Sequence, residues 1–141
     1  MNGYSLTELA IVLMLIGIVM AFGVPAATRG RDAMAVAGAR DEVTSAFAAA
    51  RSAAILHGGA VLVLETVPGR VRLEAPDGRA IGDAREITAS HGVTLECDRG
   101  AVVMLRFDAL GVGRITNGVI RLRRGGARAT LTVSAYGRVR Q

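Results

Sequence analysis

The chain has 141 residues, which allows one globular domain of roughly 100–150 residues and leaves little room for a second. Its composition is 51% hydrophobic and 4% aromatic, which excludes a fully disordered chain. The single cysteine, Cys97, excludes an intrachain disulfide. All 17 basic residues are arginines, and the +5 net charge is unevenly distributed. Residues 1–98 hold 8 arginines against 11 acids, a net −3, whereas residues 99–141 hold 9 arginines against 1 acid, a net +8.

The first predicted element is a membrane-spanning helix. The 19 residues from Leu9 to Ala27 carry no polar side chain. At ~1.5 Å per residue a helix of this length approaches the ~30 Å thickness of the bilayer hydrocarbon. A cleaved secretory signal needs a shorter apolar core and a cleavage site after that core. Here the unusual residues precede it, and Glu8 is costly at the edge of an apolar helix, so its carboxylate calls for a partner.

Gly3 followed by Tyr4-Ser5-Leu6-Thr7-Glu8-Leu9 and the apolar segment resembles the processing site of type IV prepilins and type II secretion pseudopilins. The resemblance implies that residues 1–3 are a leader, and that a prepilin peptidase cuts between Gly3 and Tyr4 and N-methylates Tyr4. It also implies that Glu8 pairs with the terminal amine of a neighbouring subunit during assembly. The alternative is an ordinary signal anchor in which Glu8 merely lies at the membrane interface.

The helix is expected to continue beyond the membrane to about residue 57. Five apolar residues recur on one helical face, and His57-Gly58-Gly59 is a C-terminal stop. These residues are Val36, Val43, Phe47, Ala50 and Ala54. Pro25 should bend the helix because it removes a backbone hydrogen bond. We therefore predict a membrane half, residues 4–28, and a soluble domain, residues 29–141, whose helical part packs on a sheet and leaves Arg51 solvated.

From Ala60 onward, alternating apolar residues and frequent turn residues predict an antiparallel meander, and hence an α+β fold. The expected strands are Ala60–Val67, Arg70–Ala75, Glu86–Ala89, Gly92–Cys97, Ala101–Phe107, Arg114–Thr116, Gly118–Arg124 and Ala127–Ser134. Hairpin signals at Asn117-Gly118 and Gly125-Gly126 predict that the last three strands are consecutive neighbours. The segment Leu105–Arg114, the hairpins and the terminal Gly137-Arg138-Val139-Arg140 resemble the domain of GspH/FimT-type minor pseudopilins, whose fold packs β-sheets on the helix.

Catalytic and metal chemistry is not expected. His57, His91 and Cys97 have no partner at a zinc-like spacing, so we predict no metal and no cofactor. Ser90 and His91 are adjacent on an expected extended segment, where neighbouring side chains point to opposite faces and make a poor dyad. We therefore expect a protein that is not an enzyme, with His91 as a turn residue and Cys97 in the core or near a strand end.

The basic C-terminal third carries the other candidate site. Arg121 and Arg123 alternate with aliphatic residues, Arg128 lies on the threonine side of the next strand, and Arg138 and Arg140 share one face of the tail. One interpretation is anion binding, and the resemblance to the FimT branch implies DNA through Arg138 and Arg140. The other is a solvated edge whose charges prevent sheet-to-sheet aggregation.

Together these features predict a minor pilin or pseudopilin. Such a protein is a structural subunit of an inner-membrane-anchored filament, with its soluble domain in the periplasm. Its expected partners are other pilin or pseudopilin subunits, the prepilin peptidase, the inner membrane and, as a candidate ligand, DNA. The alternative is a type II secretion minor pseudopilin of the GspH kind, which contacts other pseudopilins or cargo.

Overall fold

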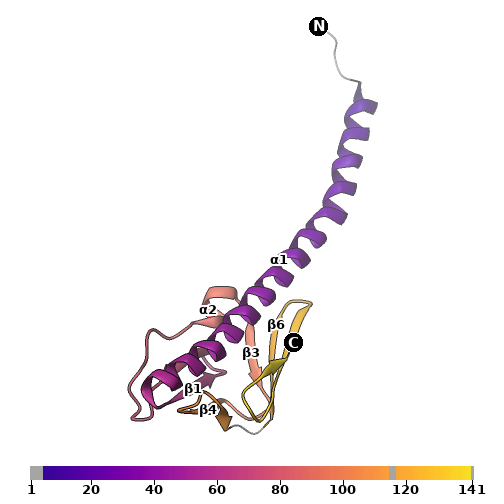
Figure 1. Cartoon of the computed structure of the whole chain (residues 1–141). Coiled ribbons are helices and arrows are strands. Elements are labelled where there is room, and N and C mark those ends of the chain that lie inside the picture. The colour runs from indigo at the N-terminus through magenta and orange to yellow at the C-terminus, as the bar shows by residue number, and fades with distance from the viewer. Residues whose placement is uncertain (1–4, 115–116, 141) are drawn as a thin grey trace.

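The computed structural model describes residues 5–114 and 117–140, so the predicted cleavage residues Gly3 and Tyr4 lie outside the described residues (Figure 1). Its dominant element is α1, a 52-residue helix over Leu6–His57. Ser5 caps the start of this helix, because its side-chain oxygen accepts a hydrogen bond from the Glu8 amide at 3.2 Å. Gly58 ends it in the left-handed conformation, with φ of 74°. The predicted single long helix and its end are confirmed.

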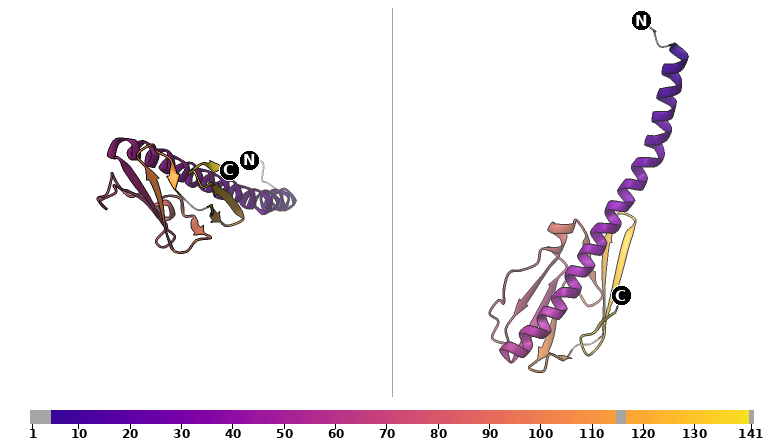
Figure 2. Two further views of the ribbon diagram at one scale, coloured as in Figure 1. Left: turned by 60° about the horizontal axis from the view of Figure 1, so that its bottom comes forward. Right: turned by 45° about the horizontal axis from the view of Figure 1, so that its top comes forward.

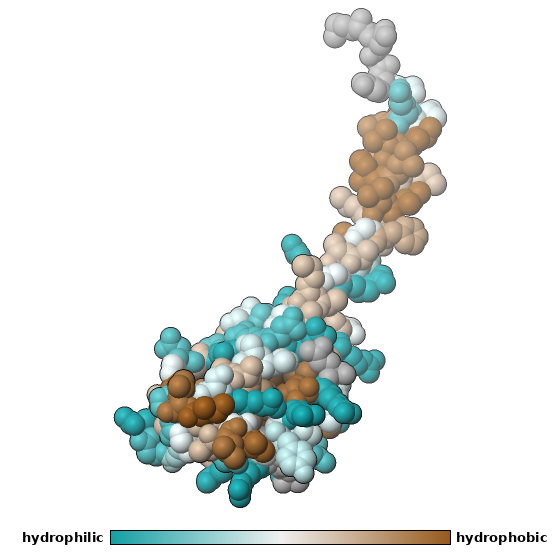
Figure 3. Space-filling model, in the orientation of Figure 1, coloured by the Kyte–Doolittle hydropathy of each residue, from teal (hydrophilic) through white to brown (hydrophobic). Residues whose placement is uncertain are grey.

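The N-terminal half of α1 stands away from the rest of the chain. Residues 5–31 are exposed, and Figure 3 shows an apolar surface along this part of the helix. Within the described part of the chain, α1 is the one helix long and apolar enough to cross a membrane. The helix curves on its way to the domain (Figures 1 and 2). Pro25 lies inside it and cannot donate to the preceding turn, which accounts for such a bend.

The C-terminal half of α1 forms one wall of the core. The five residues predicted to share a face, Val36, Val43, Phe47, Ala50 and Ala54, are all buried. Phe47 meets Phe107 of the sheet edge-on, with ring centroids 6.4 Å apart and planes at 79°. The many alanines on this face let the helix lie close to the strands.

Two four-stranded antiparallel sheets pack against α1, as the α+β prediction requires (Figure 2). The first sheet, A, has the order β2-β1-β4-β5, and the second, B, has the order β3-β6-β7-β8. The strands of sheet A are β1 (Gly59–Glu65), β2 (Arg70–Glu74), β4 (Val102–Asp108) and β5 (Gly113–Arg114). Those of sheet B are β3 (Thr94–Cys97), β6 (Gly118–Arg124), β7 (Ala127–Val133) and β8 (Val139–Arg140). Apolar residues from both sheets and α1 form a single core.

The predicted strand Glu86–Ala89 is wrong, because the chain forms a short helix there, α2, over Ile87–His91. Ile87 is fully buried, whereas the rest of α2 is at least partly exposed. The segment therefore has a single buried residue and lacks the alternating buried and exposed residues of a strand. Gly92 ends α2 in the left-handed conformation and donates its N–H to the Thr88 carbonyl at 2.8 Å.

The predicted meander of the last three strands is also wrong in part. The hairpin at Gly125-Gly126 joins β6 to β7 as expected, but β5 pairs with β4 in the other sheet. The carboxylate of Asp108 accepts hydrogen bonds from the amides of Leu110 and Val112, each at 3.0 Å. This tight loop turns the chain back onto β4, so β5 pairs with β4 and not with β6. Residues 115–116, the remainder of that predicted strand, lie outside the described residues.

Candidate interaction surfaces

Glu8 lies in the first turn of α1, where the positive end of the helix dipole favours a carboxylate. Its side chain is exposed, and within residues 5–114 and 117–140 it forms no ion pair. The first arginine, Arg29, comes 21 residues later, about 31 Å along the helix. The described chain therefore offers Glu8 no cation, and any countercharge in an apolar environment has to come from elsewhere.

Sheet B presents a basic face on the side away from α1. We define this basic face as the exposed residues Arg121, Arg123, Arg128 and Arg140. The intervening residues Ile120, Leu122, Leu131 and Val133 are buried in the core. The alternation predicted from the sequence, with aliphatic residues inward and arginine and threonine outward, is confirmed.

Strand register groups the charges of the basic face. Arg123 stands directly opposite Arg128, Arg121 opposite Thr130, and Arg140 opposite Thr132. At ~3.4 Å per residue, the Arg128 and Arg140 rows lie about 14 Å apart along β7. Directly opposed like charges destabilise a sheet by tenths of a kcal/mol to about 1 kcal/mol. An anion bound over this face would relieve that repulsion.

Few acids offset the basic face. Arg123 lies 3.6 Å from Glu96 of β3, and both side chains are largely exposed, so this pair adds little stability. Arg121, Arg128, Arg138 and Arg140 form no ion pair with any described residue. Arg121 stands opposite Glu96 in register without forming an ion pair, so this edge of the protein keeps a net positive charge.

The outer face of sheet A provides a contrast, because its arginines on β2 are paired within the sheet. The Glu65 carboxylate lies 2.5 Å from Arg70 and 3.3 Å from Arg72, and Arg72 also lies 3.2 Å from Glu74. The hydrogen bond from Arg70 lowers the pKa of the Glu65 carboxyl. Glu65 therefore stays ionised at neutral pH, and these arginines are less available to an external anion than those of sheet B.

Arg51 holds the C-terminal tail against the helix. Its guanidinium donates a hydrogen bond to the Gly137 carbonyl, so the prediction of a solvated helix residue is wrong. Gly137 is buried with φ of 72°, and a Cβ there would lie 2.8 Å from the Phe107 ring. The turn before β8 is therefore built for glycine. It leaves Arg138 exposed beside an open cavity of about 470 Å³ that Arg51 and Tyr136 also line.

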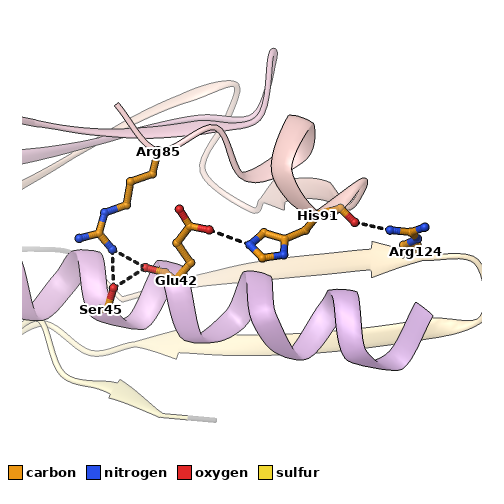
Figure 4. A network of polar contacts seen from close by, with 5 residues as sticks. All are labelled: Glu42, Ser45, Arg85, His91 and Arg124. Carbon is orange, nitrogen blue, oxygen red and sulfur yellow. Dashed lines mark hydrogen bonds and ion pairs between the residues drawn. The ribbon is translucent and has the colours of Figure 1, made fainter. Parts of the chain in front are cut away.

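A polar network around Glu42 and His91 was not predicted from the sequence (Figure 4). His91 is the last residue of α2, and its Nε2 lies 2.7 Å from the Glu42 carboxylate of α1. Arg124 of β6 donates to the His91 carbonyl, and Arg85 donates to the Glu42 carbonyl at 3.0 Å and to Ser45. The network ties α1, α2 and sheet B together, which gives it a structural role.

Among the residues that the structure describes, the remaining candidates for catalysis or metal binding do not form a cluster. Cys97 ends β3 in a half-buried position, as expected, and burial raises the pKa of its thiol, which lowers its reactivity. No group of three or more His, Cys, Asp or Glu that could hold a metal ion occurs among the residues the structure describes.

Comparisons with known proteins find no match to this chain, whether among family models, curated proteins or solved structures.

Proposed function

We propose that this protein is a minor pilin or pseudopilin, a structural rather than catalytic subunit of a type IV pilus-like filament. In this proposal the apolar half of α1 anchors the subunit in the inner membrane and the two-sheet domain lies in the periplasm. The observation that carries the proposal is Glu8, an acid without a described cation, placed at the start of an exposed apolar helix.

An ordinary signal anchor accounts for the apolar helix and leaves Glu8 at the membrane interface without a partner, whereas a filament gives its carboxylate one. In a filament, the exposed half of α1 packs against the same half of neighbouring subunits, which covers its apolar side chains. Cleavage after Gly3 frees the amine of Tyr4, and that amine on a neighbour supplies the countercharge for Glu8. A buried pair of this kind favours one axial register, because any slip leaves a charge unpaired in an apolar environment.

Cleavage tests this proposal directly. We expect the membrane form to begin at Tyr4 with a methylated amine in cells that contain a prepilin peptidase, as measured by mass spectrometry of the N-terminal peptide. Gly3→Ala should be processed better than Gly3→Val, because the peptidase site is expected to need a small side chain. An intact Met1 in such cells contradicts the pilin proposal.

We propose DNA binding as a second function, supported by the net positive charge of the basic face and of Arg138. We propose that Arg138 and Arg140 contact the phosphates of duplex DNA, helped by Arg121, Arg123 and Arg128. The face is a sheet surface without base-reading side chains in a helix, so binding should be weak and independent of DNA sequence. A type II secretion pseudopilin of the GspH kind needs no such ligand, and DNA binding therefore distinguishes the two alternatives.

The salt dependence of binding measures the number of phosphate contacts. For the domain from Arg29, we expect Arg138→Ala with Arg140→Ala to reduce the slope of log affinity against log salt by nearly 2, about 0.9 per contact. Fluorescence anisotropy across a salt series measures this slope.

A matched control for this experiment is Arg106→Ala with Arg114→Ala. This variant removes the same charge from two facing exposed positions on sheet A and should leave the slope unchanged. Equal slopes for all three proteins contradict a phosphate contact by the tail, and absence of wild-type binding at low salt removes DNA from the proposal.

A further inference from the structure

The turn between β6 and β7 lies against α1 close to the end of the apolar segment. Arg124, at the end of β6, places its Nε 3.0 Å from the carboxylate of Asp32 on α1. Gly125 in the turn lies so close that a Cβ would collide with the same carboxylate. In Figure 1 and in the right view of Figure 2, this hairpin lies alongside α1 and reaches the part of the helix that leaves the domain.

The rise of the helix gives the distance of this turn from the end of the apolar segment. The apolar segment ends at Ala27, and Asp32 follows five residues later, about 7.5 Å further along the axis. The head-group layer on each side of a bilayer is about 5–7 Å thick. If α1 spans the membrane up to Ala27, the β6–β7 turn lies at the outer boundary of the head groups, and Arg29 lies within them.

Four exposed arginines gather at this level. Arg29 and Arg31 follow the end of the apolar segment on α1, and Arg123 and Arg128 face each other beside the turn. The nearby acid, Asp32, is already paired with Arg124, and the exposed pair between Arg123 and Glu96 is weak. Figure 3 shows hydrophilic residues where the apolar half of α1 meets the domain.

We propose that these four arginines form a membrane-contact site that binds the phosphate groups of anionic phospholipids. The site is continuous with the proposed membrane anchor, on which it rests, and its charge is complementary to an anionic membrane surface. Each basic residue near such a surface strengthens the contact about fivefold. Contact on both α1 and the β6–β7 turn fixes the tilt of the domain over the bilayer while the subunit awaits assembly.

The test measures how close the turn lies to the head groups. Gly126 is exposed, and a Cβ there meets nothing within 4 Å, so Gly126→Cys in a Cys97→Ala background can carry a fluorophore at the turn. The full chain is reconstituted in vesicles of phosphatidylcholine with or without phosphatidylglycerol, each containing a lipid with a quencher on its head group. We expect stronger quenching in the anionic vesicles, and a loss of this difference at high salt.

Two double variants test which arginines make the head-group contact. Arg123→Gln with Arg128→Gln should weaken the head-group contact by about 25-fold, about fivefold for each arginine. Arg106→Gln with Arg114→Gln, the same charge change at the far end of the domain, should have no effect. A fluorophore at Leu110→Cys, whose loop packs near Arg51, serves as the distal control and should remain unquenched.

Equal quenching in the two kinds of vesicle, or an unchanged contact after removal of Arg123 and Arg128, overturns the proposal. If that double variant loses DNA binding and keeps its head-group contact, the two arginines belong to the DNA site instead. Cleavage after Gly3 and filament assembly are measured separately. A failure of this proposal is therefore distinguishable from a failure of the pilin proposal, and a chain that does not insert into vesicles removes both.

Discussion

Glu8→Ala is expected to leave membrane insertion intact and to remove most of the subunit from purified filaments. Deleting a carboxylate makes transfer of the helix into the bilayer easier, by about 2.5–3.5 kcal/mol at the bilayer centre and by less at the edge. A loss of assembly therefore has to come from the missing pair between subunits. Membrane fractionation and recovery of the subunit in sheared filaments measure the two effects separately.

Two further substitutions, one at Glu8 and one at the adjacent residue, provide the comparison and the control. Glu8→Gln keeps the size of the side chain and removes its charge, so it should fail as Glu8→Ala does. Thr7→Ala alters the adjacent exposed residue of the same helical turn and should assemble normally. Normal assembly of both Glu8 variants would mean that Glu8 lies at the membrane interface without a subunit partner, as in an ordinary signal anchor.

Phe47→Ala is expected to destabilise the domain by about 3–5 kcal/mol, since this is the typical cost of emptying a buried phenylalanine site. Phe47 is 2% exposed and packs edge-on against Phe107, and it joins α1 to the strands of the core. Domains of this size have free energies of unfolding of about 5–15 kcal/mol, so the variant should lose a large part of its stability. Urea unfolding of the domain from Arg29, followed by circular dichroism, measures the change in the free energy of unfolding.

Met34→Ala is the matched control for that substitution. Met34 lies on the same helix but is 78% exposed, and surface changes of this kind usually alter stability by less than about 0.5 kcal/mol. A similar loss in both variants would contradict a specific contribution of the Phe47 contact, because alanine is the stronger helix former at both positions.

Local patterns were sufficient for the elements whose causes are local. The buried face of α1 could be predicted because residues three and four apart share a face of a helix, and its end could be predicted because Gly58 adopts a left-handed conformation. The β6–β7 hairpin and the outward arginines could be predicted because side chains alternate along a strand. Periodicity failed to predict α2, because a single buried residue, Ile87, cannot show whether apolar residues repeat as in a helix or as in a strand.

The sequence by itself therefore determined the long helix with its apolar half, the position of Glu8, and a strand-rich domain with arginines on one outer face. Only the tertiary structure decided the partner of β5, the attachment of the tail by Arg51, the pair between Glu42 and His91, and the position of the β6–β7 turn beside Asp32. The last three contacts join residues 86, 49 and 92 positions apart. Such contacts depend on how the core brings the two sheets onto α1, and no local periodicity encodes that arrangement.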